Sequence, residues 1–503
     1  MTKEKNKIML IIILILISLI ALVGSSYALL TKSFKSKKLS MEVGTLKIDF
    51  AEGNAINMAN AAPMADSDGL KSTPYTFTIT NGGDINAYYT VSNEEELANT
   101  LDTSYLRMKL TGSDGYDSGI KTVKELGTET YKLVDETLLE TGKSVTYELR
   151  MWISQDAGND IQDKIYKSKI VVNGTSNKLP LATEKLIAKA NAEDLDYNSA
   201  TDTQKKEMWT FTHDATEQTT ALTDYRYIGA DPNNYVKFND ELWRIIGVFD
   251  TDDGTGKVEK KLKIIRNESI GDYSWDNKNK TTGAENDYGK NEWTDARLNY
   301  LLNPGHESET AGGSLYWNRG AGICYRRQNN ATTACDFTTT GLTEKAKAMI
   351  GDAKWYLGGS STYNDVTAPM FYTRERGTGV YSGRSTSWTG KVGLMYPSDY
   401  GYATSGGTTT NRASCLAKEM SNWDDSSVSD CKNNDWMYNS SIYQWTITPR
   451  QVNTFDVFYV EDTGCVHSFI AYNYLGVRPV VHLNSAIKVI TGSGTKESPY
   501  ILE

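Results

Sequence analysis

Cys465 and His467 are the candidate nucleophile and base of this chain. A single residue separates them in a strand-like run. Alternate residues of a strand point to the same face, so the two side chains are expected side by side. A thiolate activated by a neighbouring imidazole is a nucleophile of the kind used in covalent catalysis. The sequence identifies no Asn or Asp to orient this pair, and a buried, inert thiol is the competing interpretation of Cys465. An enzyme that uses Cys465 and His467 is therefore one hypothesis.

An acidic loop, NWDDSSVSDC, offers a second kind of chemistry. Its Asp424, Asp425 and Asp430 could supply the oxygen ligands that Ca²⁺ prefers. The loop superficially resembles the Trp-Asn-Asp calcium and sugar motif of lectins, although that motif is not present in its full form. A solvated acidic loop is the alternative. We expect no resident cofactor, and calcium at these aspartates is the one metal that the sequence suggests.

Aromatic side chains crowd residues 355–402, in a chain with 31 Tyr and only 11 Phe. Aromatic rings among Ser, Gly and Asn are typical of surfaces that recognise proteins or sugars. The candidate binding residues are Trp388, Tyr400, Tyr402 and Trp423. The alternative is that these rings form the core of a loop-rich domain.

Arg478 and Pro479 stand inside an apolar run that reads as a buried strand, residues 477–483. An arginine is seldom fully buried without a partner, and a proline removes a hydrogen bond from a sheet. Arg478 therefore either binds a ligand or holds the fold together. If it is structural, it should be buried against a carboxylate or several carbonyl groups, and Pro479 should mark an edge or a bulge.

Other functional classes find little support. A net charge of −10 argues against a nucleic acid partner, which would favour basic patches. The chain contains no HExxH, GxSxG, Walker A or CxxC motif and no convincing GxGxxG, so the enzymes built on those motifs are not expected. The four histidines of the whole chain make a histidine-rich metal site improbable.

The N-terminus predicts export. Three lysines precede an unbroken apolar run, residues 8–24, and the small-residue site SYA ends at Ala28. Residues 1–30 are either a signal peptide cleaved near Ala28 or an anchor that crosses the membrane through residues 8–30. Lysines on both sides leave the orientation open.

Cysteine spacing agrees with export. Cys324 and Cys335 flank one polar loop, and Cys415 and Cys431 flank another. Local pairs of this kind are typical of disulfides formed in an oxidising compartment. We predict these two bridges, with Cys465 left over.

Residues 39–177 alternate like an antiparallel β-sandwich. The segment LETGKSVTYELRMWIS places Val145, Tyr147, Leu149, Met151 and Ile153 on one face. The N-terminal segment ending in SYAL, the strand ending in GTLKIDF and the run FTITNGGDINAYYTV together resemble the TasA/camelysin family. Members are secreted, immunoglobulin-like proteins of Gram-positive bacteria, and some build matrix fibres. The resemblance implies an immunoglobulin-like domain that could assemble by strand donation.

Residues 178–221 are polar and helix-prone, and we expect a linker with short helices there. Residues 222–503 alternate short strands with long polar loops, which predicts an α+β domain. Helical spacing appears at residues 293–303 and again at residues 341–359, where Thr343 is the expected N-cap. The overall fold class is therefore mainly β with an α+β second domain.

The second domain also contains motifs in an ordered series: ELWRIIGVF, WTDARLNYLLN, LTEKAKAMI, KVGLMYPSD, YQWTITP and GVRPVV. This order resembles a family of uncharacterised extracellular bacterial domains related to the formylglycine-generating-enzyme and C-type-lectin-like fold. The resemblance implies structural roles for Trp445 and Arg478. The oxidising enzymes of that group need two nearby active cysteines, whereas four of the five cysteines here are assigned to disulfides.

Three hypotheses follow. The first is a non-enzymatic adhesin or recognition protein, anchored to or released from a Gram-positive-type cell, with a glycan or protein ligand. The second is a fibre subunit that self-assembles by β-augmentation. The third is the enzyme using Cys465 and His467.

Overall fold

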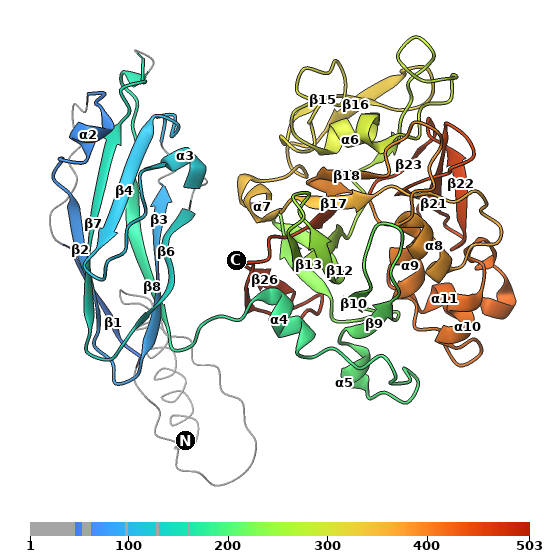
Figure 1. The fold of residues 1–503 in the computed structure, drawn as a ribbon, viewed down its shortest axis with the longest axis horizontal. Coiled ribbons are helices and arrows are strands. Elements are labelled where there is room, and N and C mark those ends of the chain that lie inside the picture. The colour runs from blue at the N-terminus through green and yellow to red at the C-terminus, as the bar shows by residue number, and fades with distance from the viewer. Residues whose placement is uncertain (1–45, 53–61, 96–98, 127–129, 159–160) are drawn as a thin grey trace, which may run out of the picture. The chain divides into compact units, whose positions relative to one another are not determined.

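The computed structural model describes residues 46–52, 62–95, 99–126, 130–158 and 161–503 (Figure 1). The chain divides into two compact units, residues 1–179 and residues 180–503. The expected signal peptide or anchor at residues 1–30 lies outside the described residues. Within the described residues, no helix is both long and apolar enough to cross a membrane.

Unit 1 consists of two antiparallel sheets. The five-stranded sheet has the order β1-β2-β7-β4-β5, with β1 (Ile48–Glu52), β2 (Tyr75–Asn81), β7 (Ser144–Ile153), β4 (Leu106–Gly112) and β5 (Lys121–Thr122). The three-stranded sheet has the order β6-β3-β8, with β6 (Thr130–Leu139), β3 (Ala87–Glu95) and β8 (Ser168–Thr175). Two short helices complete the unit, α2 (Asp66–Gly69) and α3 (Val123–Leu126).

Side chains from both sheets share one core. Val145, Tyr147 and Leu149 of β7 are buried, as their alternation predicts, and they pack with Tyr89 of β3. The hydroxyl groups of Tyr89 and Tyr147 lie 2.6 Å apart and share a hydrogen bond. The prediction that this part of the chain is mainly β is therefore confirmed.

Unit 2 has two larger sheets and two separate hairpins. The strands of its nine-stranded sheet are β9 (Trp209–His213), β10 (Leu222–Arg226), β11 (Tyr235–Phe238), β12 (Glu241–Asp252), β13 (Val258–Arg266), β19 (Val392–Gly393), β24 (Val480–His482), β25 (Val489–Thr491) and β26 (Tyr500–Leu502). The five-stranded sheet has the order β14 (Asp272–Ser274), β23 (Tyr474–Gly476), β20 (Gln444–Pro449), β21 (Asp456–Val460) and β22 (Val466–Ile470). The hairpins are β15 (Ala321–Tyr325) with β16 (Thr332–Asp336), and β17 (Ala353–Tyr356) with β18 (Ser387–Gly390).

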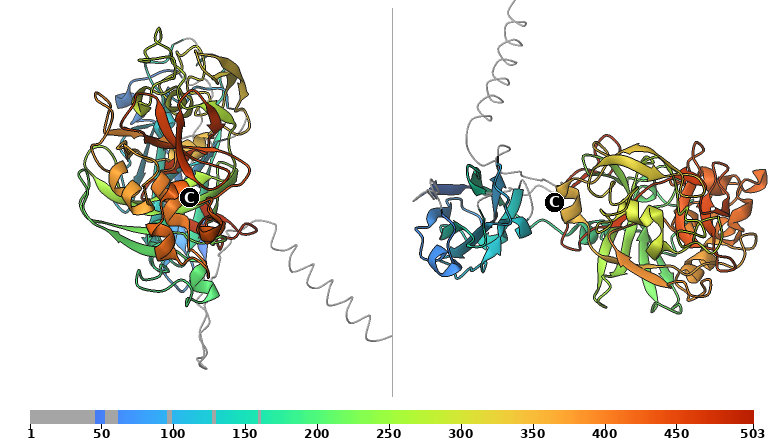
Figure 2. Two further views of the ribbon diagram at one scale, coloured as in Figure 1. Left: turned by 90° about the vertical axis from the view of Figure 1, so that its right-hand side faces the viewer. Right: turned by 90° about the horizontal axis from the view of Figure 1, so that it is seen from above.

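The helices of unit 2 are short. They are α4 (Ala182–Ile187), α5 (Asp202–Lys205), α6 (Arg297–Leu302), α7 (Glu344–Met349), α8 (Ala368–Glu375), α9 (Pro397–Ala403), α10 (Arg412–Ala417) and α11 (Asp430–Asn433), with 3-10 turns η2 (Trp293–Asp295), η3 (Met420–Asn422) and η4 (Ser426–Val428). Helices α8 to α11 gather at one end of the unit (Figures 1 and 2). Thr343 caps α7 as expected, because its hydroxyl accepts a 3.1 Å hydrogen bond from the Ala346 amide.

The short helices expected at residues 178–221 are present as α4 and α5, but the segment is not a linker. The segment from Pro180 onward belongs to unit 2. Ala182 and Leu186 of α4 are buried in the core of that unit, and β9 pairs with β10. The polar composition of the segment reflects its outer surface, while a few apolar side chains attach it to the fold.

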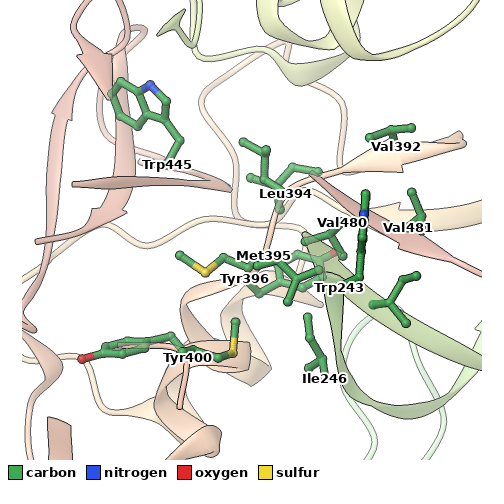
Figure 3. Close-up of a cluster of buried hydrophobic side chains, with 14 of the residues drawn as sticks. Trp243, Ile246, Val392, Leu394, Met395, Tyr396, Tyr400, Trp445, Val480 and Val481 are labelled. Atoms are coloured by element: carbon green, nitrogen blue, oxygen red, sulfur yellow. The ribbon is translucent and has the colours of Figure 1, made fainter. Parts of the chain in front are cut away.

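The core of unit 2 gathers side chains from both sheets. In the view of Figure 3, the segment Leu394–Tyr396 lies between Trp445 of β20 and Trp243 of β12, and all are buried. The indole of Trp445 donates a 3.0 Å hydrogen bond to the carbonyl of Tyr273. A buried and hydrogen-bonded Trp445 agrees with the structural role expected of it.

Arg478 and Pro479 do not lie within a single strand. The chain leaves the five-stranded sheet at Gly476 and enters the nine-stranded sheet at Val480, so these two residues form the crossing. The Arg478 guanidinium, 5% exposed, donates hydrogen bonds of 2.9 Å to the Arg266 carbonyl and 3.0 Å to the Gln444 amide oxygen. One acceptor belongs to each sheet. Arg478 therefore ties the two sheets together, through carbonyl groups rather than a carboxylate.

We expect Arg478→Ala to lower the free energy of unfolding by about 2–3 kcal/mol, because it leaves two buried acceptors unpaired. Burial lowers the pKa of Arg478 to about 10, with nearby Arg244 adding to the effect, so its charge is poorly solvated. Removing this poorly solvated charge in Arg478→Ala offsets part of the loss in the free energy of unfolding. Urea unfolding followed by tryptophan fluorescence measures the change; an unchanged unfolding midpoint accompanied by lost ligand binding would assign Arg478 to a binding site instead.

Candidate binding site

The β15–β16 hairpin carries a rigid polar loop, Arg326 to Ala331. The strands below it are joined by the disulfide Cys324–Cys335, and the second predicted bridge, Cys415–Cys431, is also present. Both predicted pairings are therefore confirmed, and they indicate an oxidising compartment. The hairpin register continues to the pair Tyr325 and Thr332, so six residues form the loop.

The loop holds an unusual backbone conformation. Arg327, Asn329 and Asn330 have φ angles of 73°, 56° and 56°, in the left-handed region that side chains rarely adopt. Buried Asn277 stabilises them, because its side-chain amide donates to the carbonyls of Arg327 (2.6 Å) and Ala331 (3.0 Å). Its own carbonyl accepts a 3.0 Å hydrogen bond from the Asn330 amide. The loop conformation is thus fixed from beneath.

The facing wall comes from the turn between β22 and β23. There a hollow of about 300 Å³ is lined by Arg327, Gln328, Tyr472, Asn473 and Tyr474. Strand pairing fixes this wall, because Ser274 lies opposite Tyr474 and its hydroxyl donates a 2.7 Å hydrogen bond to the Tyr472 carbonyl. The hollow therefore joins two segments that lie far apart in the sequence.

At the hollow, tyrosine rings lie together with positively charged arginine side chains. The guanidinium groups of Arg326 and Arg327 lie 4.2 Å and 5.2 Å from the centre of the Tyr474 ring, within cation–π range. Arg326 also approaches Asp272 at 3.8 Å. Tyr288, 43% exposed, extends the aromatic surface, with its ring centre 6.0 Å from that of Tyr472. The arrangement can stack a flat or apolar ligand face and hydrogen-bond its polar edge.

No family model and no curated protein matches the chain. Among solved structures, one described as "AvmM Catalyzes Macrocyclization in Alchivemycin A Biosynthesis" matches 27% of this chain and 92% of its own length. The sequence identity is 9% and the TM-score is 0.16. A likeness at that level carries no argument about fold or function, so the geometry of the site is the basis for a proposal.

Cys465 and His467 are each engaged elsewhere. The Cys465 sulfur accepts a hydrogen bond from the Asp424 amide at 3.3 Å, and burial raises the pKa of its thiol to about 11. His467 lies 2.9 Å from Glu461 through Nδ1 and 3.3 Å from the Ser421 carbonyl through Nε2. A protonated, buried thiol is a poor nucleophile. These contacts support the inert interpretation of Cys465 over the catalytic one.

Two of the three candidate calcium ligands, Asp425 and Asp430, use their carboxylates in local structure. Asp425 caps η4 by accepting from the Ser427 amide at 2.9 Å. Asp430 accepts from the amides of Thr409 and Thr410, at 2.8 Å and 2.9 Å. Within the described residues, no group of three or more His, Cys, Asp or Glu side chains is placed to hold a metal ion. The aspartates are therefore not brought together as a calcium site.

The predicted aromatic binding residues lie mostly in the core, which corrects that prediction. Tyr400 and Trp423 are fully buried with their ring centres 5.3 Å apart, and Tyr402 is 7% exposed. Trp388 is partly buried against Trp293. Aromatic abundance does not distinguish a surface from a core, because both use the same rings. The exposed rings lie instead near the five-stranded sheet of unit 2, at Tyr288, Tyr363, Tyr443 and Phe469.

A buried ion cluster lies beneath the helices α8 and α9, and sequence reasoning did not anticipate it. Its acids are Asp224, Glu375 and Asp399, and its bases are Arg226, Lys263 and Arg376. Each of the six residues is at most 6% exposed. Three acidic side chains therefore face three basic ones away from water, and such pairing is what makes buried charges tolerable.

Asp399 is the centre of the cluster. Its carboxylate pairs with Arg226 at 3.2 Å and with Lys263 at 2.5 Å, and it accepts from the Tyr396 amide at 2.9 Å. Burial alone would raise the pKa of Asp399, but Lys263 and Arg226 outweigh it and hold the pKa below its usual range. Because no side chain of the cluster is open to ligand, its role is to hold β10, β13 and α9 together.

Proposed function

We propose that this protein is an exported, non-enzymatic recognition protein that binds a glycan at the exterior of a Gram-positive-type cell. The hollow between the β15–β16 loop and Tyr474 carries this proposal. Sugar rings present an apolar face and a polar edge, which suit aromatic rings flanked by amide and guanidinium groups. The disulfides support export, since they need an oxidising compartment.

In this proposal the two units divide the work. Unit 1 is an immunoglobulin-like stalk, and unit 2 is a C-type-lectin-like domain that presents the hollow. Residues 1–30 either anchor the chain or direct its secretion. A rigid loop suits recognition, because a site that is already ordered loses little entropy on binding.

Self-assembly into fibres is the second candidate. Strand β1 forms an edge of the five-stranded sheet of unit 1 and pairs with β2 alone among the described strands. An edge strand of this kind is the element that strand exchange would use. Filaments formed by the purified chain would favour this function over ligand binding.

Binding is tested with the purified full chain in mild detergent on an array of glycans and extracellular proteins. We expect glycan binding that Tyr474→Ala weakens about tenfold, which corresponds to about 1.4 kcal/mol of lost ring contact. Tyr443→Ala is the matched control, because Tyr443 is 43% exposed, directly precedes strand β20 of the same sheet and does not line the hollow. Silence across the glycans, or equal loss in both variants, would contradict the proposal.

A further inference from the structure

Arg327 stands out among the arginines of unit 2. Its guanidinium lies over the Tyr474 ring, and it makes no hydrogen bond or ion pair with any residue that the structure describes. The other arginines of the unit have a polar partner, either a carboxylate, as in the pairs Arg297–Glu309 and Arg450–Asp456, or a neutral acceptor, as Arg478 has. Arg327 therefore presents a charge without a counter-ion to the hollow.

Arg326 does not line the hollow, but it places a second cation against the Tyr474 ring. Among the described residues, Asp272 at 3.8 Å is the one carboxylate that pairs with Arg326, and the buried Arg326 Nε atom has no hydrogen-bond partner there. Two guanidiniums thus lie beside a single tyrosine ring, and the one nearby carboxylate pairs with Arg326 and not with Arg327. The local excess is positive, in a chain whose net charge is −10.

The loop geometry shows that Arg327 is held in place. Its positive φ angle of 73° is maintained by the hydrogen bond from Asn277 to its carbonyl. The Cys324–Cys335 bridge closes the hairpin beneath it. The backbone that carries the guanidinium is therefore set before any ligand arrives, and a planar guanidinium suits two-point recognition of an anion.

We propose that the hollow binds a sugar that bears a carboxylate or a sulfate group, with the anion held by Arg327. The sugar face stacks on Tyr474. The amides of Gln328 and Asn473 meet its hydroxyl groups; the Asn473 amide uses one hydrogen bond, to the Ile470 carbonyl, and can make others. This inference rests on the proposed function and names the class of its ligand.

The test uses the full chain in mild detergent and three probes of matched length. These are a uronic-acid oligosaccharide, the same oligosaccharide with its carboxyl groups reduced, and a sulfated oligosaccharide. We expect at least tenfold tighter binding of one or both acidic probes than of the reduced probe. The preference should weaken as salt is raised, because this charge pair is open to water. The probe that binds identifies which anion the site takes.

Variants assign the preference to Arg327. Arg327→Ala should abolish it, and Arg327→Lys should retain only part, because an ammonium group cannot make the paired hydrogen bonds of a guanidinium. Arg319→Ala is the matched control, since Arg319 lies at the other end of the same hairpin. Intact tryptophan fluorescence confirms that each variant is folded.

The outcomes separate the two proposals. Equal binding of acidic and reduced probes, lost in Tyr474→Ala but unchanged in Arg327→Ala, would overturn the anion inference and leave glycan recognition standing. An acidic preference that survives Arg327→Ala would also overturn it. Absence of binding to all three probes and to the wider array would overturn the proposed function itself.

Discussion

Asp399→Ala is expected to lower the free energy of unfolding of unit 2 by about 4 kcal/mol, because it leaves two buried cations without their shared carboxylate. Arg226 retains Asp224 at 2.8 Å, whereas Lys263 has no other carboxylate partner among the described residues. The lost hydrogen bond to the Tyr396 amide at the start of α9 adds to the cost. Lys263 is therefore the group that makes this substitution severe.

Urea unfolding followed by tryptophan fluorescence measures this effect in unit 2, because every tryptophan except Trp152 lies after residue 180. Asp250→Ala is the control. Asp250 pairs with Lys260 at 3.0 Å, but both side chains are partly exposed, so its loss should cost less than about 1 kcal/mol. Similar small losses in both variants would show that the cluster is hydrated and contributes little.

Glu375→Gln is expected to change how stability depends on pH. Burial raises the pKa of Glu375 to about 7, against the opposing effects of Arg376 and the hydrogen bonds from Ser398. Between the ordinary pKa of a glutamate and pH 7, the folded protein then holds a proton that the unfolded chain has released. The free energy of unfolding therefore falls as pH rises through this window, by about 3 kcal/mol for this group.

Glutamine is neutral at every pH, so Glu375→Gln should lose this part of the pH dependence. The wild-type protein should be destabilised relative to the variant by about 3 kcal/mol more at pH 8 than at pH 4.5. Buried Asp276, whose pKa burial raises to about 6, acts in both proteins and cancels in the comparison. Urea unfolding at intervals across this range gives both curves.

Ser398→Ala checks the sign of the pH effect. It keeps the Glu375 carboxyl and removes a hydrogen bond that favours the ionised form. Its pH dependence should be at least as steep as that of the wild-type protein. Parallel curves for the wild-type protein and Glu375→Gln would show that Glu375 is ionised in the folded state throughout the range.

The local features were predictable from the sequence. The cysteines of each disulfide are 11 and 16 residues apart, so neighbouring strands and loops bring them together without long-range folding. The buried face of β7 follows from period-two alternation, and the cap at Thr343 follows from its place before a helical run. These are short-range effects, and the residues that cause them are adjacent in the chain.

The hollow and the ion cluster were not predictable, because each depends on residues from distant segments. Arg327 and Tyr474 meet only through the pairing of β14 with β23 and the support of Asn277. In the sequence Asp399 looks like an ordinary turn residue, and only the folded chain places Arg226 and Lys263 against it. The sequence does not show which charged side chains are buried, because burial of a charge depends on partners that only the folded chain brings next to it.

The sequence by itself determined a mainly β chain, two local disulfides and a buried Arg478. Tertiary structure alone decided that Arg478 joins two sheets, that Tyr400 and Trp423 are core residues, and that residues from 180 onward belong to unit 2. Periodicity reports which side of a segment is apolar. It does not report which distant part of the chain covers that side. The covering segment decides whether an aromatic ring or a charged side chain lies in the core or at the surface.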